Sequence, residues 1–261
     1  MNLKANQYFG ITTDSLTTEN FNISLTNHSA NSTIDLHAHN KPYLCLLASG
    51  TYKEISNTTE IITQGEVLYR VANYEHSNIF SSKGGLCLNI EMIDYEQFIT
   101  LNELQLPNKV SKQKGVIELY KLLYGLKQGL PNDIINIYCY ESLIAVINIF
   151  NCKGNIDWIK KVKERINDNP LETISLDKLS LEFSLHPNYI VRKFKEITGY
   201  KLSEYLTKIR LEHSMKHLLS NEENITSIAL ESGFYDQSHF NKNFKKHLDT
   251  TPNHFRKVIT G

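Results

Sequence analysis

Hydrophobic and polar positions alternate in short segments over the first hundred residues. Aromatic and β-branched residues are concentrated in residues 21–26, 33–39, 43–49, 66–71 and 86–92, and Ser-Gly, Gln-Gly and Gly-Gly pairs interrupt the pattern between them. Such pairs are typical of turns between strands. Many short strands at close spacing predict an antiparallel β-barrel or jelly roll in this part of the chain.

The pattern changes to helical spacing after about residue 115. Apolar residues recur three or four positions apart in two stretches, separated by turn-forming residues 128–132. The stretches are marked by Val116, Leu119, Tyr120, Leu123 and Leu126, and by Ile134, Ile137, Tyr138, Leu143, Ile144, Ile147 and Phe150. The second is apolar around much of its circumference. It either forms a dimerisation face or packs only on its own barrel.

The last hundred residues contain one pattern twice. Residues 186–195 (His-Pro-Asn-Tyr-Ile-Val-Arg-Lys-Phe-Lys) are matched fifty positions later by residues 236–245 (Asp-Gln-Ser-His-Phe-Asn-Lys-Asn-Phe-Lys). Each copy predicts a short apolar helix, a tight turn and a second helix with an outward basic face, which together form a helix-turn-helix unit. Residues 202–219 lack proline and glycine and predict one connecting helix. Two such units can contact two neighbouring stretches of DNA major groove.

The second helix of each unit has a predicted start and a predicted outward face. Pro187 suits the first helical position, where the missing N–H costs nothing, and Asp236 is placed to cap the other helix. Because Phe194 and Phe244 turn towards a core, the opposite side chains remain to contact DNA. These are Asn188, Val191, Arg192 and Lys195 in the first copy, and Gln237, Ser238, His239, Asn241 and Lys242 in the second.

Residues 189–195, 205–211, 228–234, 244–247 and 251–256 agree in order and spacing with a known family. Through them the last 105 residues or so resemble the DNA-binding domain of the AraC/XylS family of bacterial transcription regulators. The resemblance implies base contact by Arg192, double-stranded DNA and RNA polymerase as partners, and a homodimer. The family usually has glycine where Ser184 stands, so this residue must form the first turn without glycine's conformational freedom.

Charge differs between the two ends of the chain. Residues 156–261 contain 17 Lys and Arg against 14 Asp and Glu, whereas residues 1–155 contain 11 against 14. The neutral total therefore conceals an asymmetry that fits nucleic-acid binding at the C-terminal end. Many solvated helical domains are equally basic, so the asymmetry agrees with DNA binding without establishing it.

Three histidines are the sharpest chemical signal in the N-terminal half. His37 and His39 are two residues apart on a predicted strand, so they share one face, and His76 can supply a third nitrogen. Residues 37–39, 44–52, 65–68 and 75–78 resemble the cupin-like sensory domain that precedes many AraC-family DNA-binding domains.

Three interpretations of these histidines stay open. His37, His39 and His76 bind a divalent metal such as Zn²⁺, Mn²⁺ or Fe²⁺, or they line an effector pocket with Tyr43, or they form a purely structural strand face. Metal-binding cupins usually have a carboxylate at the position of Tyr43, and a phenol replaces it poorly.

We therefore expect a multidomain α+β protein. Residues 1–105 form the cupin-like antiparallel β-barrel, residues 106–152 a helical hairpin, and residues 153–261 an all-α domain with two helix-turn-helix units joined by a linker helix. Residues 151–155 are the expected interdomain linker. A mass of 30.0 kDa allows ordinary cores in both domains.

The composition indicates the expected cellular location of the protein and the expected role of its cysteines. No apolar run is long enough to cross a bilayer, and the first residues lack the organisation of a secretory signal, so we expect a cytoplasmic protein away from membranes. Cys45, Cys87, Cys139 and Cys152 form no Cys-x-x-Cys pair. They are expected to be small buried hydrophobic residues rather than redox or zinc ligands.

The favoured function is a DNA-binding transcription regulator that senses a small-molecule effector in its barrel and is not an enzyme. No cofactor is expected, apart from the divalent metal considered for the histidines. Two alternatives are a metal-dependent cupin enzyme fused to a DNA-binding domain, and a constitutive DNA binder with a structural barrel. Tyr43 in the carboxylate position argues against the enzyme. No nucleophilic triad, phosphate-binding loop or paired-carboxylate motif stands out in the sequence.

Overall fold

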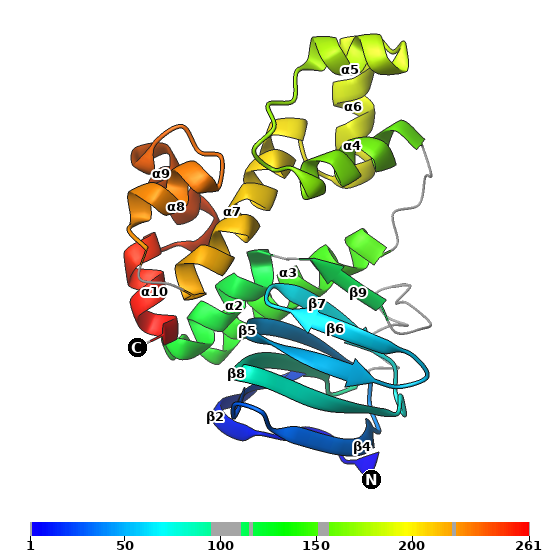
Figure 1. Cartoon of the computed structure of the whole chain (residues 1–261), viewed down its shortest axis with the longest axis vertical. Coiled ribbons are helices and arrows are strands. Elements are labelled where there is room, and N and C mark those ends of the chain that lie inside the picture. The colour runs from blue at the N-terminus through cyan, green and yellow to red at the C-terminus, as the bar shows by residue number, and fades with distance from the viewer. Residues whose placement is uncertain (1, 95–110, 115–116, 151–156, 221–222, 261) are drawn as a thin grey trace. The chain divides into compact units, whose positions relative to one another are not determined.

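The computed structural model describes residues 2–94, 111–114, 117–150, 157–220 and 223–260 (Figure 1). The chain divides into two compact units, residues 1–150 with 255–261 and residues 151–254. Among the helices described, none combines the length and the hydropathy needed to cross a membrane.

A sheet of nine strands forms the N-terminal unit. The strands are β1 (Asn2–Leu3), β2 (Ile11–Thr17), β3 (Phe21–His28), β4 (Thr33–His39), β5 (Tyr43–Ile55), β6 (Thr59–Thr63), β7 (Glu66–Arg70), β8 (His76–Met92) and β9 (Ser111–Lys114). Its main order is β1-β4-β8-β5-β7-β9, with β3 also on β8, β2 on β3 and β6 on β5. All pairs are antiparallel except β1 with β4. The predicted antiparallel architecture is confirmed as a half-barrel, and the short strands β1, β2, β6 and β9 are additions to the prediction.

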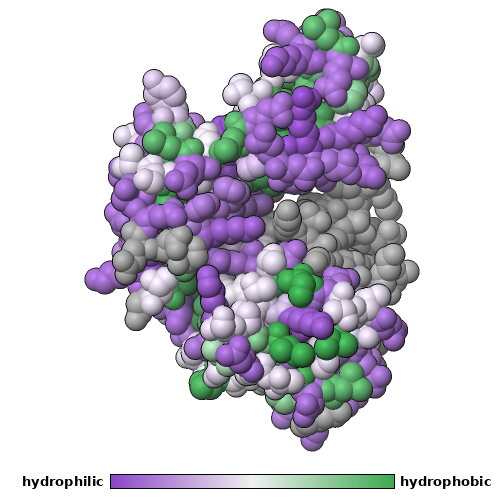
Figure 2. Space-filling model, in the orientation of Figure 1, coloured by the Kyte–Doolittle hydropathy of each residue, from purple (hydrophilic) through white to green (hydrophobic). Residues whose placement is uncertain are grey.

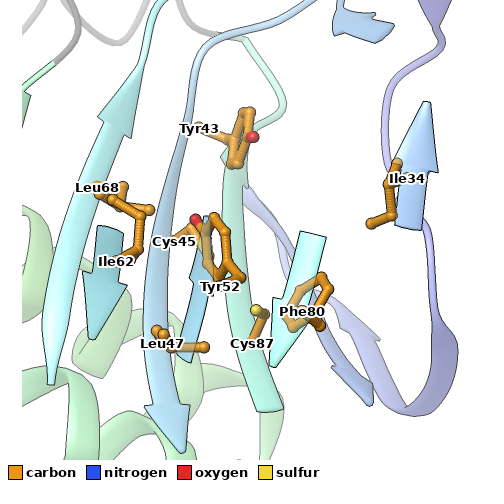
Figure 3. Close-up of a cluster of buried hydrophobic side chains, with 9 residues drawn as sticks. All are labelled: Ile34, Tyr43, Cys45, Leu47, Tyr52, Ile62, Leu68, Phe80 and Cys87. Carbon is orange, nitrogen blue, oxygen red and sulfur yellow. The ribbon is translucent and has the colours of Figure 1, made fainter. Parts of the chain in front are cut away.

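Two facing glycines change the side-chain alternation of the central strands. Gly50 of β5 lies opposite Gly85 of β8, and the register shifts on both sides of Gly50. Cys45 and Tyr52 therefore point into the same interior although one position is odd and the other even (Figure 3). Gly50 has a φ of +90°, and a Cβ there would lie 2.1 Å from the Gly84 carbonyl oxygen. Only glycine fits this position.

The predicted helical hairpin is present and packs on the sheet. It consists of α2 (Ile117–Lys127) and α3 (Asn132–Phe150). The Tyr140 ring of α3 meets the Phe21 ring of β3 edge-on, with centroids 5.0 Å apart. Lys127 of α2 forms an ion pair with Asp14 of β2 at 3.1 Å. The hairpin is thus anchored on its own β-domain.

Part of the apolar surface of α3 stays open to solvent. Ile137 and Ile144 are about half exposed and lie seven residues apart, on one side of the helix. This is the surface that remains for the predicted dimerisation. Val116 and the side chains of Ile147 and Phe150 lie outside the described residues.

Helices alone form the C-terminal part of the chain. They are α4 (Asp157–Asp168), α5 (Leu176–Phe183), α6 (Pro187–Thr198), α7 (Leu202–Ser220), α8 (Ile225–Glu231), α9 (Gln237–Leu248) and α10 (Pro252–Thr260). The pairs α5–α6 and α8–α9 are the two predicted helix-turn-helix units, and α7 is the predicted connecting helix. Ile190 and Phe194 of α6 pack into a cluster with Trp158 of α4. In the second unit, Phe240 has ring contacts with Phe234 at 5.0 Å and Phe244 at 5.5 Å.

Left-handed residues terminate helices in both units. Ser184 ends α5 with a φ of 52°, so it adopts the conformation that glycine would adopt more easily, as the sequence predicted. At the ends of α6 and α9, Gly199 and Asp249 have φ values of 78° and 56°. The repeat of fifty residues therefore extends to the backbone conformation of the helix ends.

The cysteine prediction is confirmed where the structure describes these residues. Cys45, Cys87 and Cys139 are buried free thiols. Burial raises the pKa of Cys139, so this thiol stays protonated and behaves as a small hydrophobic group. Cys152 lies outside the described residues.

One ion pair is buried in the half-barrel. Arg70 Nη2 of β7 donates to both carboxylate oxygens of Glu54 of β5 at 2.7 Å, and the two side chains are only 3% and 7% exposed. The Tyr74 hydroxyl donates to Glu54 at 3.5 Å. Removal of one partner leaves a desolvated charge, which costs about 3–5 kcal/mol, whereas removal of both costs much less.

We predict that Arg70→Met lowers the free energy of unfolding of the β-domain by about 3–5 kcal/mol, and that Glu54→Leu in the same chain restores most of it. Urea unfolding followed by far-UV circular dichroism measures the change. Trp158 is the only tryptophan and lies in α4, so its fluorescence reports the helical part and should shift little. A double variant no more stable than Arg70→Met would contradict the prediction.

Candidate functional site

A stripe of mostly polar side chains runs along the exposed side of α6. Asn188, Val191, Arg192 and Lys195 are all exposed, and their spacing places them on one face of the helix. Lys193 lies beside the stripe and is held by Glu196 at 2.7 Å. Arg192, by contrast, has no ion pair within the described part of the chain. Its guanidinium is therefore available for an external acceptor.

The repeat places a second stripe on α9. Ser238, His239 and Lys242 are exposed. Gln237 is half-buried, and its Oε1 accepts a hydrogen bond from the Thr226 hydroxyl at 2.6 Å. This interaction ties Gln237 to α8, so it is less available than predicted.

The prediction from the sequence omitted one residue of the second stripe. Lys245 is exposed at the position fifty residues after Lys195, so the repeat itself could have identified it. Asn241, which corresponds to Val191, is half-buried. The stripe on α9 thus consists mainly of Ser238, His239, Lys242 and Lys245.

The starts of both stripe-bearing helices are capped. His186 Nδ1 accepts the Asn188 N–H at 3.3 Å at the start of α6, and Asp236 Oδ1 accepts the His239 N–H at 2.7 Å at the start of α9. The cap at Asp236 was predicted, whereas the histidine cap was not. A capped start determines which side chains occupy the first exposed turn. The face of the C-terminal helices in Figure 2 is mostly hydrophilic, as phosphate and base contacts require.

A second candidate site is a small cavity inside the half-barrel. Its volume is about 40 Å³, and it combines aromatic, imidazole, amide and thiol groups. The lining residues are Tyr8, Phe9, Thr26, His28, Ile34, His37, His39, Tyr43, Cys45, Tyr52, Leu68, His76, Asn78, Phe80, Cys87 and Asn89. All four residues predicted for the effector site, His37, His39, Tyr43 and His76, are brought together here.

Strand pairing brings the three histidines together. His37 of β4 lies directly opposite His76 of β8 in the register, and their ring centroids are 4.3 Å apart. His39 shares the face of His37 and lies 5.3 Å from it. One ring nitrogen from each of the three lies within 4.8 Å of the others. The rings are buried, so three nitrogen atoms converge away from bulk water.

Backbone carbonyl groups orient these rings. His37 Nδ1 is 2.9 Å from the Asp35 carbonyl oxygen, and His76 Nδ1 is 3.0 Å from that of Tyr74. Since a carbonyl can only accept, each Nδ1 carries the proton in the neutral ring, and each Nε2 carries a lone pair. Burial lowers the pKa of His39, and the backbone of Gln7 lies close enough to that ring to raise it in part.

Burial keeps the site neutral. It lowers the pKa of His39 to about 4 and that of His76 to about 3, with the neighbouring His37 as the next cause in each case, and it also lowers the pKa of His37. Burial raises the pKa of Tyr8 and Tyr43 well above 10. At pH 7 the site therefore presents neutral imidazoles and neutral phenols.

A segment between β1 and β2 covers the histidines. The Tyr8 ring lies 5.1 Å from His39, and the Phe9 ring contacts His37 edge-on at 4.8 Å. The N–H of Asn6 donates to Glu91 of β8 at 3.1 Å, which anchors the segment. Sequence reasoning missed these residues, because the segment has neither strand alternation nor a recognisable motif.

The chain matches the family described as "Helix-turn-helix domain" over residues 179–258. It is 35% identical over 101 residues to the probable transcription factor PqrA of Proteus vulgaris, a match that covers 39% of this chain and 81% of that protein. It is 27% identical over 241 residues to the HTH-type transcriptional activator RhaS of Mannheimia succiniciproducens, covering 84% of this chain and 88% of that one.

Coverage varies among the relatives. The chain spans only 22% and 54% of the length of two others that it matches. Among solved structures it is similar to ToxT from Vibrio cholerae, with 15% identity and a TM-score of 0.40, over 93% of this chain and 100% of that chain.

The buried imidazoles make the β-domain sensitive to acid, and His28 tests this. Its ring stacks on Phe80 at 4.2 Å, and burial lowers its pKa to about 4. In the unfolded chain its pKa is about 6.5. Between pH 4 and pH 6.5, His28 is therefore protonated in the unfolded chain but neutral in the folded protein. The free energy of unfolding decreases as the pH falls from 6.5 towards 4.

We predict that the free energy of unfolding of the β-domain falls between pH 7 and pH 5, and that His28→Gln reduces this fall by about 1–2 kcal/mol. Urea titrations at the two pH values measure the difference. An identical pH dependence in wild type and variant would show that His28 titrates normally in the folded protein.

Proposed function

Because this chain belongs to the AraC family of DNA-binding transcription regulators, we propose that it binds specific sites through α6 and α9 and responds to a small ligand in the histidine pocket. The observation that carries the DNA-binding part is the repeated exposed stripe, with Arg192 and Lys195 on α6 and Lys242 and Lys245 on α9. Arginine reads guanine through two parallel hydrogen bonds, and lysines neutralise phosphates.

The connecting helix supports the use of both units together. α7 has 19 residues, and at 1.5 Å per residue it is about 28 Å long. Successive major grooves on one face of DNA are about 34 Å apart. A helix of this length between the two units suits engagement of neighbouring grooves by one chain.

The pocket supports the regulatory part of the proposal. Burying three imidazoles without partners is unfavourable, and the His37 and His76 rings each use only one nitrogen on a backbone carbonyl. The remaining nitrogens face a cavity rather than a packed core. RNA polymerase is the proposed partner on DNA, in keeping with relatives named as transcription activators.

We predict that Arg192→Ala weakens binding to a selected DNA site by about 1–3 kcal/mol, or 5- to 150-fold, and weakens binding to random DNA much less. Arg192→Lys should lose most of the same specificity, because lysine keeps the charge but not the paired hydrogen bonds. Lys193→Ala is the matched control, since Lys193 is already held by Glu196. Fluorescence anisotropy against both DNAs measures the ratio. Equal losses on both DNAs would reassign Arg192 to phosphate contact.

A separate experiment tests how the two helix-turn-helix units share the DNA site. DNase footprinting of the full chain should protect about two helical turns per monomer, with centres about 34 Å apart. Lys242→Glu should expose one half of this footprint and leave the half bound by α6. Wild-type protection of a single turn would show that α9 does not enter the groove.

A further inference from the structure

The size of the cavity restricts what it can bind. One water molecule needs about 10–15 Å³ of such volume, and pockets for organic ligands usually measure about 300–1,000 Å³. The histidine pocket has about 40 Å³. It therefore has room for an ion with a few water molecules and not for an organic effector in its present shape.

The donor atoms match an ion better than they match water alone. Three neutral imidazoles present nitrogen atoms within 4.8 Å of one another. His37 and His76 donate Nδ1–H to the carbonyl groups of Asp35 and Tyr74. Metal-binding histidines commonly donate their second N–H in this way, because the hydrogen bond fixes the tautomer and the ring orientation.

We propose that His37, His39 and His76 together bind one divalent transition-metal ion of the zinc class, and that its occupancy is the signal which alters DNA binding. The regulatory half of this inference rests on the proposed function, whereas the metal site itself does not.

The ligand set selects the class of metal. Imidazole nitrogens suit Zn²⁺, Co²⁺, Ni²⁺ and Cu²⁺, whereas Mg²⁺ and Ca²⁺ require oxygen ligands. Three histidines leave a fourth position for water, as in other open zinc sites. The Tyr43 ring lies 4.5 Å from the His39 ring and stands at the sequence position where metal-binding cupins usually have a carboxylate.

The three histidines contact segments of the chain whose packing can change when an ion binds. His37 and His76 belong to paired strands, so an ion bound to both ties β4 to β8. Tyr8 and Phe9 touch His39 and His37, so a shift of either ring displaces the covering segment. An ion that pulls the rings together therefore changes the packing of residues 4–10.

A second group of potential ligands provides the internal comparison. His217, Glu223 and Glu231 also bring three ligand atoms within 4.8 Å, but none of them is buried. Exposed acidic groups of this kind are common without a metal. Variants in the two groups therefore distinguish the buried site from an adventitious one.

The experiment uses the full chain, stripped with EDTA and dialysed, with Co²⁺ and Zn²⁺ as probes. Wild type should bind one equivalent of Co²⁺, with the visible absorption bands of a four-coordinate site, and Zn²⁺ should displace it. His76→Gln and His39→Gln should lose these bands. His217→Gln, in the other group, should keep them.

DNA binding is measured on the same samples. With a site selected from a random library, Zn²⁺ should change the Kd of wild type and His217→Gln about fivefold or more, and should leave that of His76→Gln unchanged. If His76→Gln does not fold, a Zn²⁺-dependent rise in the Tm of wild type, retained in His217→Gln, serves instead.

Each contrary result has a distinct meaning. Bands that persist in His76→Gln, or vanish in His217→Gln, overturn the metal site. One bound equivalent with no change in Kd overturns the regulatory half. Absence of DNA binding with and without Zn²⁺ would refute the proposed function, while the Co²⁺ spectrum would still decide the metal site.

Discussion

Strand β8 is hydrogen-bonded along both edges, to β4 and β3 on one side and to β5 on the other. His76, Asn78 and Phe80 near its start, and Cys87 and Asn89 near its end, all line the same cavity. Because side chains alternate along a strand, a slip of one residue would turn each of these groups to the opposite face. The pocket therefore depends on one register, which the pairing on both edges holds in place.

The helix-turn-helix units follow largely from local sequence, which explains why they could be predicted. Pro187 and Asp236 specify where helices begin, and the buried phenylalanines specify which face turns inward. These signals act within a dozen residues, so one sequence contains them completely. Contacts beyond that range escaped prediction, such as the hydrogen bond that occupies Gln237 through Thr226 of the preceding helix.

The pocket was only partly predictable for a physical reason. His37 and His39 share a face through simple alternation, and the pairing with His76 could be inferred as a possibility but not as a register. The change of alternation at Gly50 and Gly85 depends on a close approach of two backbones, which no periodic pattern records. Tyr8 reaches the site from a segment without regular structure, so only the folded chain reveals it.

The length of α7 affects how the DNA sequence that this protein recognises can change during evolution. A residue inserted into a continuous helix rotates everything beyond it by about 100° and advances it by 1.5 Å. An insertion or deletion between Leu202 and Ser220 would therefore rotate one helix-turn-helix unit relative to the other. Substitutions along the exposed stripes of α6 and α9 do not change the relative orientation of the two units. On the proposed binding of both units to one DNA, the length of α7 fixes the spacing of the half-sites, whereas the bases recognised at each half-site can change.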